Sequence, residues 1–237
     1  MPKLIYIADD EENIRSLMKT FLENEGYEVR VFADGYSIRQ AVDLKMPDLI
    51  ILDVMMPGDD GLKVCAGIRK ISSVPIIIVS AKDSPIDRVN GLTLGSDDYM
   101  TKPFLPLELT ARVKALFRRA ELAKEGSRER EKEPCECGNI VLDPQSRKAY
   151  IENEVISLTP TEFDFLLYLM ERKGAAVSKK ELLEQVWGYA AAPGDLRITD
   201  DLVKRLRKKL KIQNAAAAVE TVWGYGYRVT ENEIRSV

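Results

Sequence analysis

The sequence contains no histidine and only three cysteines in 237 residues. Without histidine, a histidine-ligated metal, a histidine general base and a histidine phosphodonor are all excluded. Three cysteines are too few, and odd in number, for a disulfide framework. No stretch approaches roughly 18 consecutive apolar residues, and the amino terminus lacks the apolar core of a signal peptide. We therefore expect a cytoplasmic protein that does not contact a membrane.

Hydrophobic residues make up 45% of the chain and charged residues 31%, which is typical of a globular protein with a sizeable core. Collagen-like, low-complexity and wholly disordered chains are thereby excluded. The length favours two domains. The formal net charge of −3 conceals two concentrations of charge. Six of the eight residues from Lys204 to Lys211 are Lys or Arg, whereas residues 9–12 are all Asp or Glu.

Short apolar runs alternate with amphipathic helical patterns through residues 1–119. The middle runs are apolar without alternation, as expected for strands that are covered on both faces. This order predicts an α/β domain with a five-stranded, doubly wound parallel sheet. The expected strands are Leu4–Ala8, Glu28–Phe32, Leu49–Leu52, Ile76–Val79 and Asp98–Met100, and the clearest helices are Ile14–Asn24 and Leu107–Arg119.

Residues 120–134 are mostly charged and offer little to bury, so we interpret them as a linker. The pattern then changes for residues 135–233. Strand-like pieces at Asn139–Leu142 and Lys148–Ile151 precede three helical segments, which begin near Thr161, Lys179 and Arg197, and a hairpin over Val219–Val229. Three helices closed by a hairpin are the plan of a winged helix-turn-helix, whose third helix can enter a groove of DNA.

Polar side chains follow four of the predicted strands, where ligands collect in open parallel sheets. Asp9 and Asp10 follow the first strand, Asp53 the third, Ser80 the fourth and Lys102 the fifth. One aspartate after a strand is usually a helix cap or a turn residue, but this many polar strand ends indicate a site. Carboxylates without histidine or cysteine suit Mg²⁺. The central Asp53 is then the natural acceptor of a phosphoryl group.

Several short motifs in residues 1–119 belong together: Asp9-Asp10, Asp53 with Met55-Met56-Pro57-Gly58 and Gly61, Ser80-Ala81, Gly95-Ser96-Asp97-Asp98-Tyr99, and Lys102-Pro103-Phe104. In this combination the segment resembles a response-regulator receiver domain, which has a flavodoxin-like fold. The resemblance implies that a partner sensor histidine kinase phosphorylates Asp53. It further implies that Asp9, Asp10, Asp53 and the main-chain carbonyl of Met55 hold Mg²⁺. Lys102 would pair with the phosphoryl oxygens, and its peptide bond to Pro103 is expected to be cis.

The same resemblance implies a switch in which Ser80 moves to the phosphate and Tyr99 rotates inward. The alternative for Tyr99 is an ordinary half-buried strand tyrosine. The resemblance also implies a homodimer through the fourth and fifth units, held by three charge pairs: Arg88 with Glu108, Asp98 with Arg112, and Asp97 with Arg119. Any one of these pairs could equally be solvated surface, because exposed ion pairs contribute little.

The last predicted helix has two faces. Val203, Leu206 and Leu210 recur at helical spacing and are expected to point inward. At about 100 degrees per residue, the opposite face carries Arg197, Asp201, Lys204, Arg205 and Lys208. A charged face is normally solvated helix surface. On the third helix before a hairpin, however, it is placed to meet bases and phosphates of double-stranded DNA.

The second domain carries Leu158-Thr159 with Glu162-Phe163, Leu182-Leu183 to Val186-Trp187-Gly188, Arg205-Leu206-Arg207-Lys208-Lys209-Leu210, and Thr221-Val222 followed by Gly224, Gly226 and Tyr227. These motifs resemble the winged-helix output domain of the OmpR/PhoB subfamily. DNA contacts are implied for Arg197, Arg205 and Arg207 on the helix and for Thr221 and Tyr227 near the hairpin. Leu202 and Trp223 replace a histidine and an arginine found in many members. The DNA sequence that this chain binds therefore does not follow from the sites that other members bind.

We therefore predict a cytoplasmic transcriptional response regulator that is phosphorylated on Asp53, dimerises and binds repeated half-sites. RNA polymerase is a further candidate partner. The chain is not expected to be an enzyme beyond assisting its own phosphorylation and dephosphorylation. Two alternatives remain open: a phosphotransferase or phosphatase that turns over an aspartyl phosphate, and a regulator that binds DNA independently of phosphate.

Overall fold

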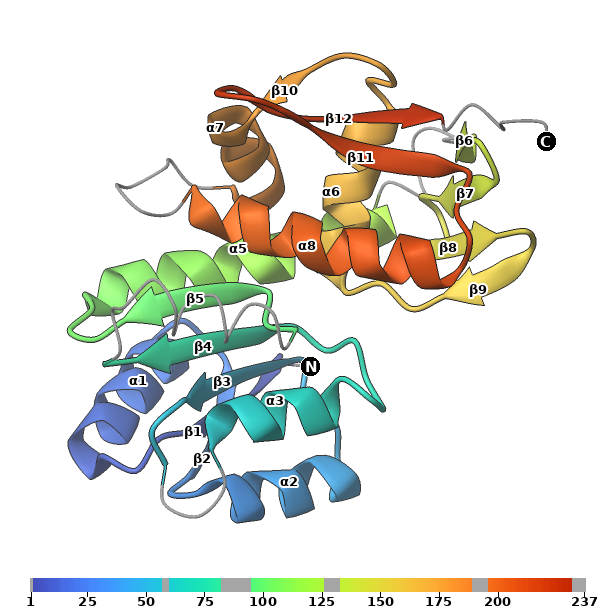
Figure 1. Ribbon diagram of the computed structural model, residues 1–237. Helices are drawn as coiled ribbons and strands as arrows, with labels where there is room; N and C mark the ends of the chain where they lie inside the picture. Colours follow the sequence, from blue (N-terminus) through green and yellow to red (C-terminus); the bar gives the residue numbers. More distant parts are fainter. Residues whose placement is uncertain (1, 57–59, 82–94, 126–132, 189–195, 232–237) are drawn as a thin grey trace. The chain divides into compact units, whose positions relative to one another are not determined.

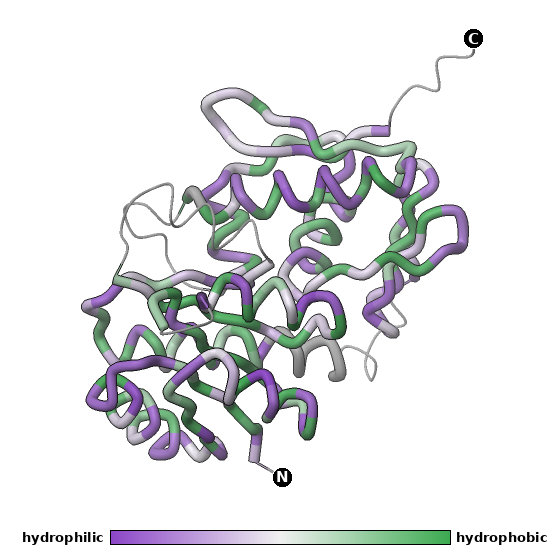
Figure 2. The backbone as a smooth tube through the Cα atoms, turned by 60° about the horizontal axis from the view of Figure 1, so that its bottom comes forward, coloured by the Kyte–Doolittle hydropathy of each residue, from purple (hydrophilic) through white to green (hydrophobic). Residues whose placement is uncertain are grey.

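The computed structural model describes residues 2–56, 60–81, 95–125, 133–188 and 196–231, without the side chains of residues 119–125 and 197 (Figure 1). The chain forms two compact units, Met1–Lys114 and Ala115–Val237. Within the part of the chain that is described, no helix is long and apolar enough to cross a membrane. In each unit, hydrophobic residues run along the interior and alternate with hydrophilic residues on the surrounding helices (Figure 2).

The first unit is built on a parallel sheet with the strand order β2-β1-β3-β4-β5, which confirms the predicted doubly wound fold. Every residue of β1, β3 and β4 is buried, because helices cover both faces. Figure 1 shows α2 and α3 in front of the sheet and α1 behind it. The strands are β1 (Leu4–Ala8), β2 (Glu28–Phe32), β3 (Leu49–Asp53), β4 (Ile76–Ser80) and β5 (Asp98–Thr101).

Two helices of this unit begin with a side-chain cap. Asp34 caps the second helix by accepting a hydrogen bond from the Ser37 N–H at 2.7 Å, and Asp60 caps the third through the Leu62 N–H at 2.8 Å. Both are favoured N-cap residues. The helices are α1 (Glu12–Asn24), α2 (Gly35–Leu44), α3 (Gly61–Ile68) and α5 (Pro106–Glu125). The last of these runs past its predicted end.

Beyond the end of α5, the described residues of the second unit form two antiparallel sheets and three helical segments. One sheet has the order β6-β7-β8-β9, with strands Cys135–Cys137, Ile140–Asp143, Lys148–Ile151 and Glu154–Ile156. The other has the order β10-β12-β11, with β10 at Val177–Ser178, β11 at Ala217–Val222 and β12 at Gly226–Glu231. The helices are α6 (Pro160–Met170), α7 (Lys179–Leu182) with the π-helix η1 (Leu183–Trp187), and α8 (Arg197–Ile212). This is the predicted winged helix.

Candidate functional site

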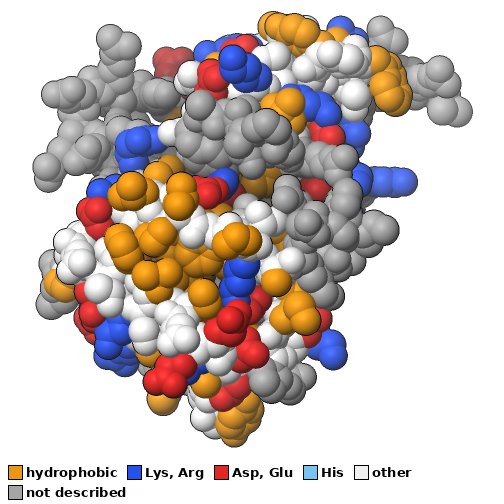
Figure 3. Space-filling model, turned by 90° about the vertical axis from the view of Figure 1, so that its left-hand side faces the viewer, with side chains coloured by type: hydrophobic (Ala, Val, Ile, Leu, Met, Phe, Trp, Pro, Cys, Tyr) orange, Lys and Arg blue, Asp and Glu red, His pale blue; other side chains and the backbone are white. Residues whose placement is uncertain are grey.

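The topology of the sheet brings three carboxylates together. β1 and β3 run side by side, with Ala8 opposite Leu52, so the residues that follow them lie at one edge. Carboxylate oxygens of Asp9, Asp10 and Asp53 all lie within 4.8 Å of one another. Asp9 and Asp53 are buried and Asp10 is exposed. The arrows of β3, β4 and β5 in Figure 1 point to the side from which Figure 3 is viewed, where acidic side chains lie beside basic ones.

Lys102 follows β5 and points into this cluster. Its ammonium Nζ lies 2.7 Å from Asp53 Oδ2, 2.8 Å from Asp9 Oδ2 and 3.1 Å from Glu11 Oε1. The peptide bond between Lys102 and Pro103 is cis, as predicted. The sequence interpretation did not assign Glu11 to the site, although its place in the acidic run of residues 9–12 was a usable signal.

Burial governs the electrostatics of the cluster. Burial raises the pKa of Asp9 above its usual range, although its interactions with Lys102 and with the Glu11 N–H oppose the rise. For Lys102, burial alone would lower the pKa, but hydrogen bonds to Asp53 and Asp9 raise it overall. The Met55 N–H donates to Asp53 Oδ1 at 3.1 Å and orients that carboxylate. The ammonium therefore supplies the positive charge that two buried carboxylates need.

The donor set of this cluster fits a hard divalent cation. All three groups offer carboxylate oxygen, which Mg²⁺ prefers to nitrogen or sulfur. Asp10 is open to solvent, so an ion held there could keep water ligands, as Mg²⁺ usually does. The fit agrees with the predicted cofactor.

The two predicted switch residues lie on adjacent strands near the cluster. Ser80 ends β4 and is fully buried, and Tyr99 in β5 is buried as well. The Lys102 N–H donates to the Ser80 carbonyl at 2.8 Å, which ties the fifth strand end to the fourth. Tyr99 is thus more deeply placed than the half-buried tyrosine of the alternative interpretation.

The dimer pair of Asp97 with Arg119 stays a prediction, but Asp97 has partners within its own chain. Its carboxylate is buried at 1% exposure. Oδ2 accepts hydrogen bonds from Arg69 Nη2 at 2.6 Å and from the Ile76 N–H at 2.9 Å. These bonds connect the end of α3 to the start of β4 and hold Asp97 inside its own chain. The side chain of Arg119 lies outside the described residues.

Asp98 and Arg112 do pair, but within one chain. The Arg112 guanidinium lies 3.0 Å from Asp98 and 2.8 Å from Glu108, and Asp98 and Arg112 are both buried. This network fixes α5 on β5. The pairing of Asp98 with Arg112 across a dimer stays a prediction. Arg88, the predicted partner of Glu108, lies outside the described residues.

The recognition helix α8 has the predicted inner face. Val203, Leu206 and Leu210 are all buried. Lys204 and Lys208 are exposed, as expected for side chains that meet DNA phosphates. The side chain of Arg197 lies outside the described part of the chain.

Two charged residues of α8 do not lie on the exposed face where the helical spacing placed them. Arg205 is buried, and its Nε lies 3.7 Å from Glu162 Oε1 in α6. Asp201 is also buried, with Oδ1 3.4 Å from Lys204 Nζ. The helical-wheel count treated every charge as outward-facing, whereas a charged side chain can be buried beside an opposite charge. The prediction that these two side chains are exposed was therefore wrong.

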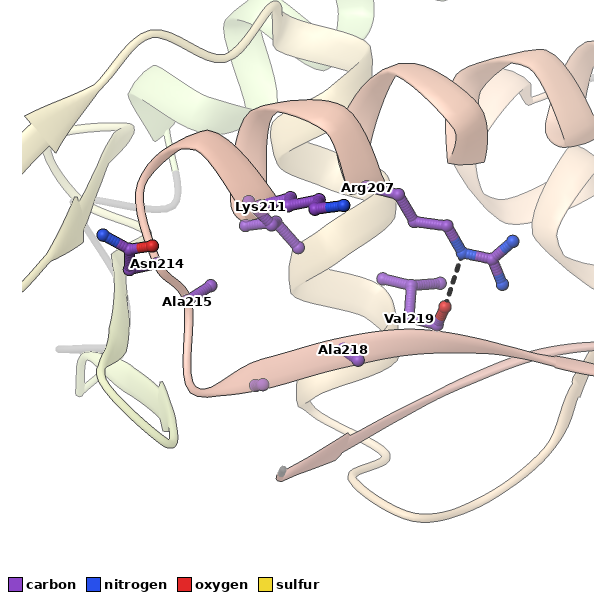
Figure 4. A pocket seen from close by; sticks show the side chains of 8 residues that line it. Arg207, Lys211, Asn214, Ala215, Ala218 and Val219 are labelled. Carbon is purple, nitrogen blue, oxygen red and sulfur yellow. Dashed lines mark hydrogen bonds between the residues drawn. The ribbon is translucent and has the colours of Figure 1, made fainter. Parts of the chain in front are cut away.

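Arg207 joins the recognition helix to the hairpin. Its Nε donates to the Val219 carbonyl at 2.7 Å (Figure 4) and its Nη2 to Thr221 Oγ1 at 2.9 Å. Arg207 and Thr221 are both exposed, as their predicted roles require. A groove of about 340 Å³ opens beside them, lined by Arg207, Leu210, Lys211, Asn214, Ala215, Ala217, Ala218 and Val219. The bridge holds helix and hairpin as one surface.

Tyr227, a predicted contact of the DNA backbone, is held by partners inside the second unit. It is buried at 4% exposure, and its hydroxyl donates to Asp200 Oδ1. Asp200 also pairs with Lys179 Nζ at 2.6 Å. The hydroxyl closes an internal network that joins β12, α8 and α7, and the DNA contact of Tyr227 stays a prediction.

This network predicts that the second unit loses stability in alkali. Burial and the bond to Asp200 raise the pKa of Tyr227 above its ordinary value of 10.0. Below pH 10 both states hold the proton, whereas above it only the folded state does, so stability falls by up to about 1.4 kcal/mol per pH unit. We expect Tyr227→Phe to reduce this slope in urea unfolding between pH 9 and 11. Tyr225→Phe, an exposed position on the same hairpin, should keep it; equal slopes in all three proteins would contradict the assignment.

The two departures from the subfamily pattern differ in exposure. Leu202 is fully buried, so it belongs to the core of the second unit and presents nothing to bases. Trp223 lies at the hairpin tip with 92% of its surface exposed. Only Trp223 therefore bears on how the hairpin meets DNA.

The fold and the two sites define a transcription regulator whose receiver domain precedes a winged-helix DNA-binding domain. Residues 5–114 match the family described as "Response regulator receiver domain", and residues 153–229 match "Transcriptional regulatory protein, C terminal". The chain is 41% identical to the alkaline phosphatase synthesis transcriptional regulatory protein PhoP of Bacillus subtilis, over 98% of each chain. It is 38% identical to the regulatory protein VanR of Enterococcus faecium, over 97% of this chain and 99% of the relative.

A solved structure agrees with these matches. The response regulator DrrB of Thermotoga maritima, described as an OmpR/PhoB homolog, superposes with a TM-score of 0.52 at 29% identity, over 97% of this chain and 100% of that one. The chain belongs to the OmpR/PhoB-type response regulators. It is a two-component transcriptional response regulator rather than a classical enzyme. This favours the predicted regulator over the alternative of a phosphotransferase or phosphatase. A histidine kinase partner and DNA binding follow from membership of the family.

Proposed function

We propose that Asp53 accepts the phosphoryl group from the histidine kinase partner. A carboxylate oxygen of Asp53 attacks phosphorus, a P–O bond forms, and the P–N bond breaks so that the kinase imidazole leaves with the electron pair. The observation that carries this proposal is the contact of 2.7 Å between Asp53 and Lys102. It keeps an ammonium beside the carboxylate that would become an acyl phosphate.

Mg²⁺ is the proposed cofactor, held by Asp9, Asp10, Asp53 and the main-chain carbonyl of Met55. When bound, it neutralises charge on the transferring phosphoryl oxygens. Lys102 would exchange part of its carboxylate contacts for those oxygens, while the Met55 N–H keeps Asp53 oriented. Together these groups let the chain assist its own phosphorylation and dephosphorylation.

Phosphorylation is proposed to act through Ser80 and Tyr99 on the β5–α5 face and to promote a homodimer. A local dianion biases an existing equilibrium and does not build a new fold. The predicted pairs across that dimer stay Arg88 with Glu108, Asp98 with Arg112, and Asp97 with Arg119. The proposed division of the chain is a receiver at 1–119, a linker at 120–134 and a DNA-binding domain at 135–233, acting in the cytoplasm.

The dimer would place two copies of α8 on repeated half-sites of double-stranded DNA. Lys204, Arg207 and Lys208 are the proposed backbone contacts of the helix, with Arg197 as a further predicted one. Thr221 is the proposed contact of the hairpin. Contacts of this kind position a protein on DNA and carry little sequence information. RNA polymerase is the further partner proposed for a regulator bound at a promoter.

The test compares the wild type with Asp53→Ala after treatment with acetyl phosphate and Mg²⁺. We expect the wild type to gain one phosphoryl group by mass spectrometry, to dimerise in sedimentation and to bind selected DNA more tightly. Asp53→Ala should show none of these changes. Asp43→Ala, the same substitution at an exposed position in α2, should behave as the wild type. Equal dimerisation and DNA binding of the wild type and Asp53→Ala would contradict the proposal.

A further inference from the structure

Glu11 makes a contact that neither the fold nor the metal site requires. It is the N-cap residue of α1, yet its side chain makes no capping hydrogen bond. Its Oε1 lies 3.1 Å from Lys102 Nζ instead. The Glu11 side chain is 61% exposed, whereas those of Asp9 and Asp53, the other two partners of Lys102, are at most 3% exposed. The ammonium is thus shared between two buried carboxylates and one at the rim.

The rim contact differs from the buried contacts in what phosphorylation does to it. Asp9 and Asp53 belong to the site in both forms of the protein, because they hold the cation and the phosphoryl group. Lys102 has three N–H donors, and all three have carboxylates within reach in the unmodified protein. A phosphoryl group on Asp53 adds new acceptors for the same donors. Glu11 is the partner at the longest distance. If Lys102 leaves it, no buried carboxylate loses its positive partner, because the Glu11 side chain is largely in solvent.

We propose that Glu11 is a positioning residue that holds Lys102 in the unphosphorylated site and so biases the receiver against the phosphorylated form. The inference rests on the proposed role of Asp53. An interaction made in one of two states shifts their populations by its own free energy. Since exposed ion pairs are weak, its loss should favour the phosphorylated form by about two- to fivefold.

The test measures the dissociation constant of beryllofluoride, a phosphoryl mimic, for the full chain by calorimetry in saturating Mg²⁺. Glu11→Gln keeps the length of the side chain and removes its charge. Glu11→Asp keeps the charge and shortens the side chain, so that it no longer reaches Lys102. Glu12→Gln makes the same charge change at the next residue, which is exposed in the first turn of α1. We expect both Glu11 variants to bind the mimic two- to fivefold more tightly, and Glu12→Gln to match the wild type.

Three results would overturn the inference. Unchanged or weaker binding by Glu11→Gln would show that the contact does not oppose the phosphorylated form. Wild-type binding by Glu11→Asp, with tighter binding by Glu11→Gln, would assign the effect to general repulsion of an anion. Tighter binding of the mimic by Glu12→Gln would also assign the effect to general repulsion of an anion. Failure of the wild type itself to bind the mimic would instead refute the proposed role of Asp53, and is thereby distinguished from these outcomes.

Discussion

Lys102→Gln should destabilise the metal-free first unit by about 3 to 5 kcal/mol. The ammonium lies within 2.8 Å of Asp9 and Asp53, and both carboxylates are almost fully buried. Glutamine can donate a hydrogen bond but brings no positive charge, so two like charges would remain buried side by side. Breaking a buried pair by removing one partner is costly for this reason. Added Mg²⁺ should restore most of the lost stability, since it supplies the missing charge.

The measurement has to separate the two units, because two domains need not unfold together. Both tryptophans lie in the second unit, so their fluorescence in urea follows that unit. Hydrogen exchange of the β1 and β3 amides follows the first. Lys114→Gln is the matched control, since Lys114 pairs with Glu25 at 2.6 Å but is 52% exposed; a change below about 1 kcal/mol is expected. If metal-free Lys102→Gln were as stable as the control, the ammonium would not be neutralising the cluster.

The first unit could be predicted closely because its sheet has a simple physical signature. Strands covered on both faces are continuous apolar runs, and the predicted β1 matches the observed, fully buried strand residue for residue. In the second unit, β9 and β10 escaped prediction. They contain three and two residues, too few for any periodicity to show. Their pairing depends on partners distant in the sequence, such as Val177 with Tyr227.

The acidic site could be predicted because parallel strands end at one edge, so topology alone brings Asp9 and Asp53 together. The sequence did not allow us to predict which individual charged side chains are buried and which are exposed. Asp97 and Arg205 carry the charge expected of surface contacts, yet each is held inside by an opposite charge, Arg69 and Glu162 respectively. Such pairs join segments far apart in the chain, and helical spacing contains no information about them.

Gly61→Ala should disturb Asp53 directly. A Cβ at residue 61 would lie 1.8 Å from the Asp53 carbonyl oxygen and 2.8 Å from its carbonyl carbon. Both atoms are backbone, so no side chain can turn away, and the end of β3 has to move. Overpacking of this kind costs about 1 to 3 kcal/mol, and the shift displaces the proposed phosphoacceptor from Lys102. We expect lower stability of the first unit and at least tenfold slower phosphorylation by acetyl phosphate.

Gly67→Ala is the matched control, because it makes the same change in the same helix. The atoms nearest to its Cβ would be those of the Arg39 guanidinium, the first at 3.4 Å, which is an ordinary contact with a flexible side chain. Alanine inside a helix is favoured over glycine by about 0.5 to 1 kcal/mol, so this variant should be as stable as the wild type or more so, and phosphorylated at the same rate. If Gly61→Ala behaved like Gly67→Ala, close packing of α3 against the end of β3 would not position Asp53. If only Gly61→Ala lost stability and phosphorylation rate, the absence of a side chain at residue 61 would be what allows Asp53 to take its position.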